Sequence, residues 1–194
     1  MTQTELIYHD ILNQIISGEM PPGHLMQEKK LAEKYSTSKM PVRDALHLLC
    51  RQGYLESQPR RGYVVTEMTR RDFEELLQAR NPLELLALDL AIVRASDEEL
   101  QQLLELSYQA DPEKDETYHS NTIWHLRLVE LSGNRYLHNI MSELMNEIAR
   151  AGCRFCVRNV NAERRAHKAI ASAMLERNRN KARRLLLKDM NGEY

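Results

Sequence analysis

Residues 31–46 read Leu-Ala-Glu-Lys-Tyr-Ser-Thr-Ser-Lys-Met-Pro-Val-Arg-Asp-Ala-Leu, and this stretch decides how the N-terminal part of the chain folds. It predicts a short helix, a tight turn and a second helix. Ser38 is a candidate N-cap of the second helix, because its hydroxyl can accept a hydrogen bond from a backbone N–H one turn on. Pro41 fits the first turn of that helix, where its missing N–H costs nothing.

The second helix carries its apolar residues at three- and four-residue spacing, at Val42, Ala45, Leu46 and Leu49. This spacing predicts one buried face over about residues 39–52. The polar and basic residues at the leading end are left exposed, which is typical of the recognition helix of a helix-turn-helix.

A further helix and a β-hairpin are predicted on either side of this pair. Isoleucines four residues apart predict a helix over 3–17, and two glycines and two prolines in the segment 18–23 end it. Short segments at 54–57 and 63–66 predict two strands.

Arg60 and Arg61 stand at the expected tip of this hairpin. Two arginines there suit contact with phosphates or with the minor groove. Alone they would be interpreted as a solvated turn, but beside a helix-turn-helix they favour DNA. Together the three helices and the basic hairpin predict a winged helix-turn-helix.

The chain shows no strand pattern after residue 70. The expected helices cover about residues 70–94, 97–109, 115–132, 135–158, 161–177 and 179–191. Pro82 should kink or divide the first of them. The predicted fold class is mainly α, with a winged helix-turn-helix of three helices plus a β-hairpin over 1–66, a linker at 67–70, and an all-α bundle of about six helices over 71–194.

Composition restricts the class of protein. The net charge is −1 for 194 residues, so any nucleic-acid site must be a local patch. No run reaches the roughly 20 apolar residues of a membrane span, and three cysteines fit a reducing compartment. We therefore expect a cytoplasmic protein with no membrane partner.

Residues 18–66 resemble the DNA-binding domain of the GntR family of bacterial transcription regulators. The matching positions are Gly18, Pro21, Gly23 and Leu25, then Leu31-Ala32-Glu33, Ser38, Pro41-Val42-Arg43, Ala45-Leu46, Leu49, Gly53-Tyr54-Leu55, Pro59, Gly62 and Val65. The remainder is similar to the all-helical FCD ligand-binding domain of the FadR-type subfamily, in its short six-helix version. That similarity rests on Arg80-x-x-x-Glu84, Asn121-x-x-x-His125, Leu131-Ser132-Gly133-Asn134 and His167.

The resemblance implies a protein that binds double-stranded operator DNA. The DNA-contacting candidates are Lys29, Ser38, Lys39, Met40, Arg43, Arg60, Arg61 and Gly62. Arg43 can pair bidentately with guanine O6 and N7. Lys39 and Met40 depart from the common family residues, and Lys39, which lacks the planar fork of arginine, suits a phosphate contact better.

The resemblance also implies one divalent metal in the second domain, held by an aspartate and three histidines. At the corresponding positions this chain has Asn121, His125, His167 and Asp189, so two positions differ. Imidazole and carboxylate ligands suit zinc, nickel or manganese. A weakened metal site and a polar pocket without metal both remain open.

Domains of this type often bind small organic acids, so we expect a small effector that carries a carboxylate. The candidate pocket residues are Arg80, Tyr118, Trp124, Arg150 and Arg154. The arginines would pair with the carboxylate; the tyrosine and the tryptophan either line the pocket or fill the core. Cys153 and Cys156 are interpreted as two half-buried small residues, with a redox switch as the lesser alternative.

These expectations describe a homodimeric transcription regulator, by default a repressor, on a palindromic operator. No catalytic motif occurs, so we do not expect an enzyme. Two alternatives are a regulator whose bundle only dimerises and senses no ligand, and a metal-dependent hydrolase.

Overall fold

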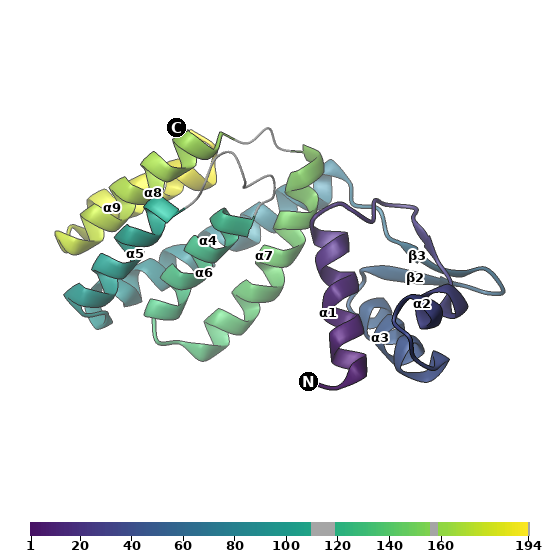
Figure 1. The fold of residues 1–194 in the computed structure, drawn as a ribbon. Helices are drawn as coiled ribbons and strands as arrows, with labels where there is room; N and C mark the ends of the chain where they lie inside the picture. The colour runs from purple at the N-terminus through teal and green to yellow at the C-terminus, as the bar shows by residue number, and fades with distance from the viewer. Residues whose placement is uncertain (110–118, 156–158, 194) are drawn as a thin grey trace. The chain divides into compact units, whose positions relative to one another are not determined.

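The computed structural model describes residues 1–109, 119–155 and 159–193, without the side chains of residues 109, 119 and 153. Within these ranges the chain forms nine helices and one small sheet, so the predicted mainly α class is confirmed (Figure 1). The chain divides into the units Met1–Thr69 and Arg70–Tyr194, and the division lies inside the predicted linker.

The N-terminal unit contains three helices, whose order and approximate limits agree with the prediction. They are α1 (Gln3–Ile16), α2 (Glu28–Lys34) and α3 (Lys39–Arg51). A reciprocal capping box starts α1: the Thr2 hydroxyl accepts a hydrogen bond from the Glu5 N–H, and the Glu5 carboxylate accepts one from the Thr2 N–H. Helix α3 packs against α1 and α2.

The sheet has three antiparallel strands in the order β1-β3-β2, one strand more than the predicted hairpin. The strands are β1 (Leu25–Met26), β2 (Leu55–Gln58) and β3 (Gly62–Val65). A strand of two residues is too short to show an alternating pattern. It exists because the fold brings Leu25 opposite Val64.

Gly62 begins β3 with a φ of +128°, which L-residues rarely adopt. A Cβ atom at this position would lie 2.2 Å from the carbonyl oxygen of Met26. The close pairing of β1 with β3 therefore requires glycine at Gly62, whatever its role toward DNA.

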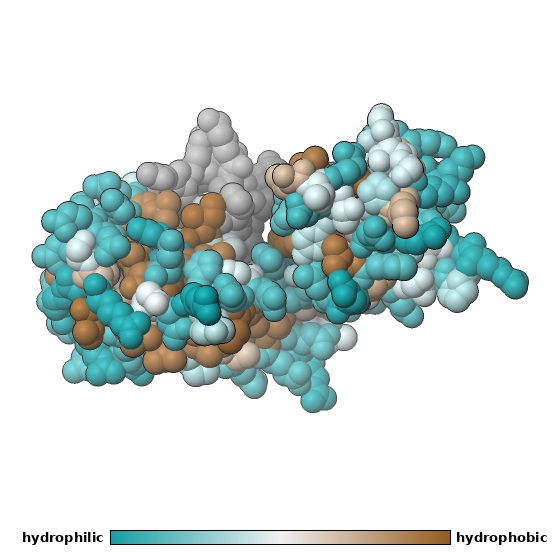
Figure 2. Space-filling view, turned by 90° about the horizontal axis from the view of Figure 1, so that it is seen from below, coloured by the Kyte–Doolittle hydropathy of each residue, from teal (hydrophilic) through white to brown (hydrophobic). Residues whose placement is uncertain are grey.

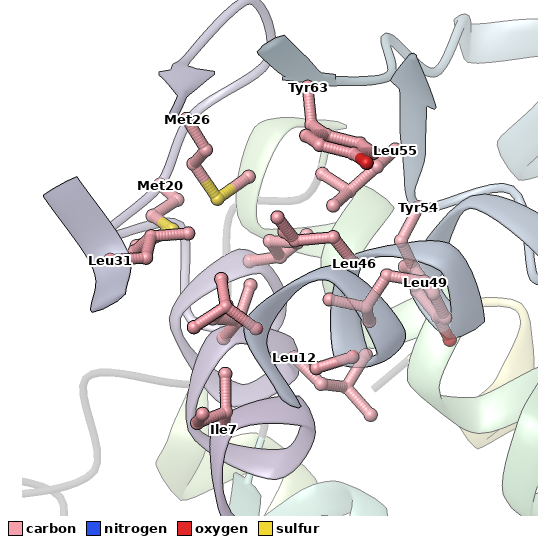
Figure 3. Close-up of a cluster of buried hydrophobic side chains, with 14 of the residues drawn as sticks. Ile7, Leu12, Met20, Met26, Leu31, Leu46, Leu49, Tyr54, Leu55 and Tyr63 are labelled. Carbon is pink, nitrogen blue, oxygen red and sulfur yellow. The ribbon is translucent and has the colours of Figure 1, made fainter. Parts of the chain in front are cut away.

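The core of the N-terminal unit lies between α1, α3 and the strands. Figure 3 shows Leu46 and Leu49 of α3 in the same cluster as Ile7 of α1 and Leu55 of β2. Full burial of each such side chain contributes about 1.5–3 kcal/mol. This packing turns the apolar face of α3 inward and leaves its other face to solvent.

The described residues of the C-terminal unit form helices and the turns between them, without a strand. Its helices are α4 (Arg70–Arg94), α5 (Asp97–Gln109), α6 (His119–Leu131), α7 (Arg135–Phe155), α8 (Val160–Leu175) and α9 (Arg179–Met190). The predicted helical residues 115–118 and 156–158 lie outside the described ranges. Helix α4 contacts α6, α7 and α9, so residues on its buried face meet side chains from several helices.

Of the two effects predicted for Pro82, the division of the helix is wrong, because α4 runs without interruption from Arg70 to Arg94. The kink stays a prediction. Pro82 is exposed, and so is Gln78, whose carbonyl loses its helical partner. Water can solvate that carbonyl on the outer face. The buried face on either side of Pro82, with Arg80 and Glu84, keeps the helix packed.

Several large apolar side chains of the C-terminal unit are exposed, among them Leu86, Val93 and Ile140. Figure 2 shows hydrophobic side chains gathered on one face of this unit. No helix in the described ranges combines the length and the apolar character needed to cross a bilayer.

Candidate functional site

Two groups of candidate residues lie in different units, and the first is the exposed face of α3. Lys39, Met40 and Arg43 are all exposed, and Met40 is 73% accessible. The opposite face, with Val42, is fully buried. The amphipathic pattern thus leaves the leading end of α3 accessible to solvent.

Ser38 occupies the N-cap position of α3 with an extended backbone, but its hydroxyl makes no capping hydrogen bond. The predicted cap bond is therefore wrong. A capping hydroxyl bonds to the N–H of the second or third helical residue. The third is Pro41, which has no N–H, so the helix start lacks one of the two usual donors. Ser38 keeps an exposed hydroxyl beside Lys39.

Arg60 and Arg61 are exposed in the turn between β2 and β3, as expected for a wing. The Arg61 N–H donates to the Gln58 carbonyl across 3.1 Å and closes the turn. Arg60 has a φ of +64°, a left-handed conformation that is costly for a residue with a side chain.

Arg43 is held by a residue that sequence reasoning did not select. Its Nε donates to Glu28 Oε1 across 2.9 Å, and a terminal nitrogen donates to Oε2 across 2.8 Å. The Tyr63 hydroxyl donates to the same Oε1 across 3.2 Å. The hydrogen bond from Arg43, opposed by partial burial, lowers the pKa of Glu28 below its ordinary value. Lys29, the next residue, is exposed, and its side chain makes no hydrogen bond or ion pair among the contacts of the described residues.

The second group is a buried polar cluster in the C-terminal unit. It consists of His125 on α6, His167 on α8 and Asp189 on α9, with one ligand-type atom of each within 4.8 Å of the others. His125 Nε2 lies 3.3 Å from Asp189 Oδ2, and His167 Nε2 lies 3.8 Å from the same oxygen. Three residues that are far apart in the sequence thus meet at one point.

Polar atoms of this cluster are buried without a hydrogen bond in the part of the chain that the structure describes. They are His125 Nε2, His167 Nε2 and Asp189 Oδ1. A buried polar atom left unsatisfied costs about 1–3 kcal/mol. Such a group in a native protein calls for an explanation, for example a bound ion.

Glu84 contacts His125 from the other side of the ring. It also accepts a hydrogen bond from Arg80 Nε across 2.6 Å, and both side chains are buried. Burial alone would raise the pKa of Glu84, but the charge of Arg80 and the contact with His125 outweigh it and lower the pKa to about 2. Glu84 is therefore a carboxylate that orients His125 through Nδ1 and leaves Nε2 toward Asp189.

The two histidines differ in their preferred charge. Burial and the Arg80 guanidinium lower the pKa of His125, but Glu84 and Asp189 outweigh them and the net shift is upward. Burial, together with the nearby His125, lowers the pKa of His167 to about 3. His167 is thus a neutral imidazole at pH 7, the form that binds metal ions.

Trp124 positions His167 rather than lining the pocket. Its ring stacks on the His167 ring with centroids 4.1 Å apart and planes 3° apart. Its indole N–H donates to Ser107 Oγ across 3.0 Å. Trp124 is buried and does not line the cavity beside the cluster, so in the structure it has the packing role that was the alternative to an effector contact.

A cavity of about 140 Å³ adjoins the cluster. Its polar lining residues are Arg80, Asn121, His125, Glu163, Asp189 and Asn191, and its apolar walls include Phe73 and Ile148. Arg150 and Arg154 do not line it: Arg150 pairs with Glu147, and the Arg154 guanidinium lies over the Phe155 ring. Tyr118, Cys156 and the Cys153 side chain lie outside the described residues.

The structure thus brings the four predicted metal-site residues together. Asn121, His125 and Asp189 line the cavity, and His167 joins His125 and Asp189 in the cluster. Sequence reasoning missed the contributions of Glu84 and Glu163 to the site. A signal existed for Glu84, because a charged pair four residues apart on an otherwise apolar helical face must be internally paired. For Glu163 we find no comparable signal.

The comparisons with known proteins agree with this division into two units. Residues 3–65 match the family model described as bacterial regulatory proteins, gntR family, and residues 75–192 match that of the FCD domain. One relative is YdhC from Bacillus subtilis (strain 168), which is named as an uncharacterized HTH-type transcriptional regulator. It is 31% identical over 197 aligned positions, and the match covers 95% of this chain and 86% of YdhC. The chain belongs to the GntR family.

Two further GntR-family relatives come from Escherichia coli (strain K12). The HTH-type transcriptional regulator McbR is 30% identical over 143 residues, which cover 71% of this chain and 65% of McbR. Its solved structure has a TM-score of 0.83 and 25% identity, and the match covers 99% of this chain and 95% of that chain. The HTH-type transcriptional repressor GlaR is 27% identical over 160 residues, which cover 77% of this chain and 73% of GlaR.

The GntR domain and the FCD domain that the sequence resembles are thereby confirmed. GntR-family proteins are transcription regulators that bind operator DNA, and they are typically dimeric. The winged unit of this chain is accordingly its DNA-binding domain.

Proposed function

We propose that this GntR-family chain is a repressor of the FadR-type subfamily, with the short six-helix version of the FCD domain. In this proposal a small organic acid, together with a divalent metal, binds in the C-terminal unit and changes operator affinity. The observation that carries the proposal is the set of buried, unsatisfied atoms on His125, His167 and Asp189 beside a polar cavity.

The donor set fits a divalent metal. Two imidazole nitrogens and one carboxylate suit zinc, nickel or manganese, and Asn121 lines the same cavity and adds an amide oxygen. Glu84 would orient His125, and Trp124 would orient His167. An amide is a weaker donor than a carboxylate, so we expect weaker binding than in a site with aspartate at that position.

The proposed effector pocket is small, and a positively charged side chain lines it. Arg80 lines it, and its guanidinium matches a carboxylate. A cavity of about 140 Å³ is below the roughly 300–1,000 Å³ of pockets for drug-sized ligands, which favours an acid of few atoms. A bound metal would supply positive charge to the acid's carboxylate.

The DNA contacts that we propose come from α2, α3 and the wing. Arg43 reads bases, Lys39 contacts phosphate, and Met40 changes the base preference. The other proposed contacts are Lys29, Ser38, Arg60, Arg61 and Gly62. A homodimer would place two such domains on a palindrome, and the exposed Leu86 and Val93 of the C-terminal unit support association.

Metal analysis tests the first part of the proposal. Protein prepared without a polyhistidine tag should contain more than about a tenth of an equivalent of metal per chain and should gain thermal stability when Zn²⁺ or Ni²⁺ is added. His167→Ala should abolish the gain, whereas the control His24→Ala, at an exposed histidine, should keep it. Less than about a tenth of an equivalent, with no thermal shift, contradicts a metal site of this kind.

Calorimetry against short carboxylic acids and sugar acids, with and without metal, tests the effector. We expect binding of a short acid that Arg80→Gln weakens at least about tenfold. A lack of binding across the panel favours the alternative in which the bundle only dimerises. One observation supports that alternative: Glu84 and Asp189 flank both ring nitrogens of His125, so the charges of this cluster are partly balanced without an ion.

A further inference from the structure

We propose that Glu28 is a positioning residue for DNA recognition, which fixes the Arg43 guanidinium so that its outer edge reads a guanine. The inference rests on the proposed contact of Arg43 with DNA and adds a residue that the proposal did not include. It is carried by the network that joins Glu28, Arg43 and Tyr63.

The geometry of the pair leaves the reading edge of Arg43 unused by Glu28. Glu28 takes Nε–H and one N–H of a terminal nitrogen, which together form the side of the guanidinium. Arginine has five N–H donors in a fixed plane, so the edge between its two terminal nitrogens still presents donors. Guanine offers two acceptors, O6 and N7, at the spacing that such an edge matches.

A hydrogen bond from Tyr63 in turn holds the Glu28 carboxylate in place. The Tyr63 ring is buried in β3, at 6% exposure, and its hydroxyl donates to Glu28 Oε1. Glu28 begins α2, and its side chain is 21% exposed. The plane of Arg43 is thus set by Glu28 on α2, which Tyr63 on β3 holds in turn, although the Arg43 side chain itself is 54% exposed.

Two physical consequences favour specific DNA over non-specific DNA. An arginine whose rotamer is already fixed loses less conformational freedom when it binds, provided that the target has acceptors in the matching place. In addition, the carboxylate cancels the charge of Arg43, which weakens its attraction to phosphates of any sequence. Glu28 therefore increases the difference between the affinities for the correct and incorrect sites, which is the quantity that defines specificity.

A contrary interpretation is that Glu28 only masks Arg43 and must release it before DNA binds. The two interpretations predict opposite changes when the carboxylate is removed. Masking predicts tighter binding to every sequence, whereas positioning predicts weaker binding to the operator alone.

Glu28→Gln in the full chain separates these interpretations, because glutamine keeps the shape and loses the charge. The operator is first selected from random duplexes with the unaltered protein, and affinities for it and for a scrambled duplex are then measured by fluorescence anisotropy at several salt concentrations. We expect operator affinity to fall about tenfold, as for the loss of one well-placed base contact, while scrambled-duplex affinity is unchanged or higher. Tyr63→Phe should produce a smaller change in the same direction.

Matched variants exclude effects of charge and folding. Glu33→Gln removes an equal charge from the exposed face of α2 and should alter the affinities for both duplexes alike. Glu28→Asp keeps the charge but shortens the reach, and should also lose specificity. Far-ultraviolet circular dichroism and thermal unfolding confirm that each variant is folded.

Arg43→Ala distinguishes failure of this inference from failure of the proposed DNA contact. If Arg43→Ala leaves operator affinity unchanged, Arg43 is no DNA contact and both ideas fall. If Arg43→Ala weakens operator binding but Glu28→Gln has the same effect with and without Arg43, only the positioning role is overturned. An equal rise in affinity for both duplexes in Glu28→Gln overturns it in favour of masking.

Discussion

At the scale of single residues, Glu84 is the centre of a buried charged network in the C-terminal unit. It is fully buried and meets both Arg80 and His125. Removing one member of a buried charged network leaves the others uncompensated, which is costlier than never having buried them.

We predict that Glu84→Gln lowers the free energy of unfolding of the C-terminal unit by about 3–5 kcal/mol, because Arg80 and His125 lose their anionic partner. The control is Glu75→Gln on the same helix, which breaks the exposed pair with Arg71 at the same four-residue spacing and should cost about 0.3–0.5 kcal/mol. Urea unfolding of metal-free protein measures both. Equal effects of the two variants would contradict the buried network.

Gly62 gives a second prediction at this scale. Gly62→Ala should destabilise the N-terminal unit by about 1–3 kcal/mol or more, because its Cβ meets the Met26 carbonyl and its φ is strained. Gly53→Ala is the matched control: its φ of +82° is also left-handed, but no atom lies within 4 Å of an added Cβ. Thermal unfolding should show a larger loss at Gly62, and a smaller loss there would argue against the close approach of β1.

At the scale of elements, α4 contains a proline that the packing tolerates. Proline in a helix interior costs about 3 kcal/mol relative to alanine, although it also restricts the unfolded chain by about 0.4–1 kcal/mol. We predict that Pro82→Ala stabilises the C-terminal unit by about 1–2 kcal/mol in urea unfolding. Destabilisation would show that the proline shapes α4 in a way that the packing needs.

Charged side chains connect α4 with α9. Asp89 on α4 accepts hydrogen bonds from Arg179 and Arg183 on α9. The hydrogen bond from Arg179, opposed by partial burial and assisted by Arg183, lowers the pKa of Asp89. A lowered folded-state pKa means that this contribution is complete above the unfolded pKa of about 3.9, and is lost as the pH falls through the folded-state pKa.

We therefore predict that Asp89→Asn lowers the melting temperature of the C-terminal unit by about 2–4 °C at pH 7, and that the difference from the unaltered protein disappears as the pH falls through the lowered folded-state pKa of Asp89. Asp97→Asn, at a more exposed aspartate paired with Arg177, should show little difference at either pH. A difference for Asp89→Asn that persists at low pH would mean that the aspartate acts by packing and not by charge.

At the scale of the whole molecule, the two units have separate cores. The buried cluster of the N-terminal unit is made only of residues between Ile7 and Val65. We predict that a fragment of residues 1–69 folds by itself, with the helical circular dichroism and cooperative melting of a small domain. It should bind the operator about 10²–10⁴-fold more weakly than the full chain, since it engages one half-site without a linked partner. Equal affinity would contradict the dimeric arrangement that we propose.

The sequence predicted the order and kind of nearly all the described elements. Helix limits such as those of α3 follow from apolar spacing and from glycine and proline, which are signals between near neighbours. It also located His125, His167 and Asp189, but only through the family resemblance, because no spacing rule connects residues on three different helices. The errors at Ser38 and Pro82 arose where a neighbouring residue or the packing overrode a local rule.

The sequence by itself therefore determined a winged helix-turn-helix followed by a helical bundle, because periodicity and chain breaks act over a few residues. Only the tertiary structure decided how the charged residues pair. Glu28 meets Arg43 fifteen positions away, and Glu84 meets His125 forty-one positions away. Such pairs leave no period in the sequence, since the two partners come close together only after the elements that carry them have packed.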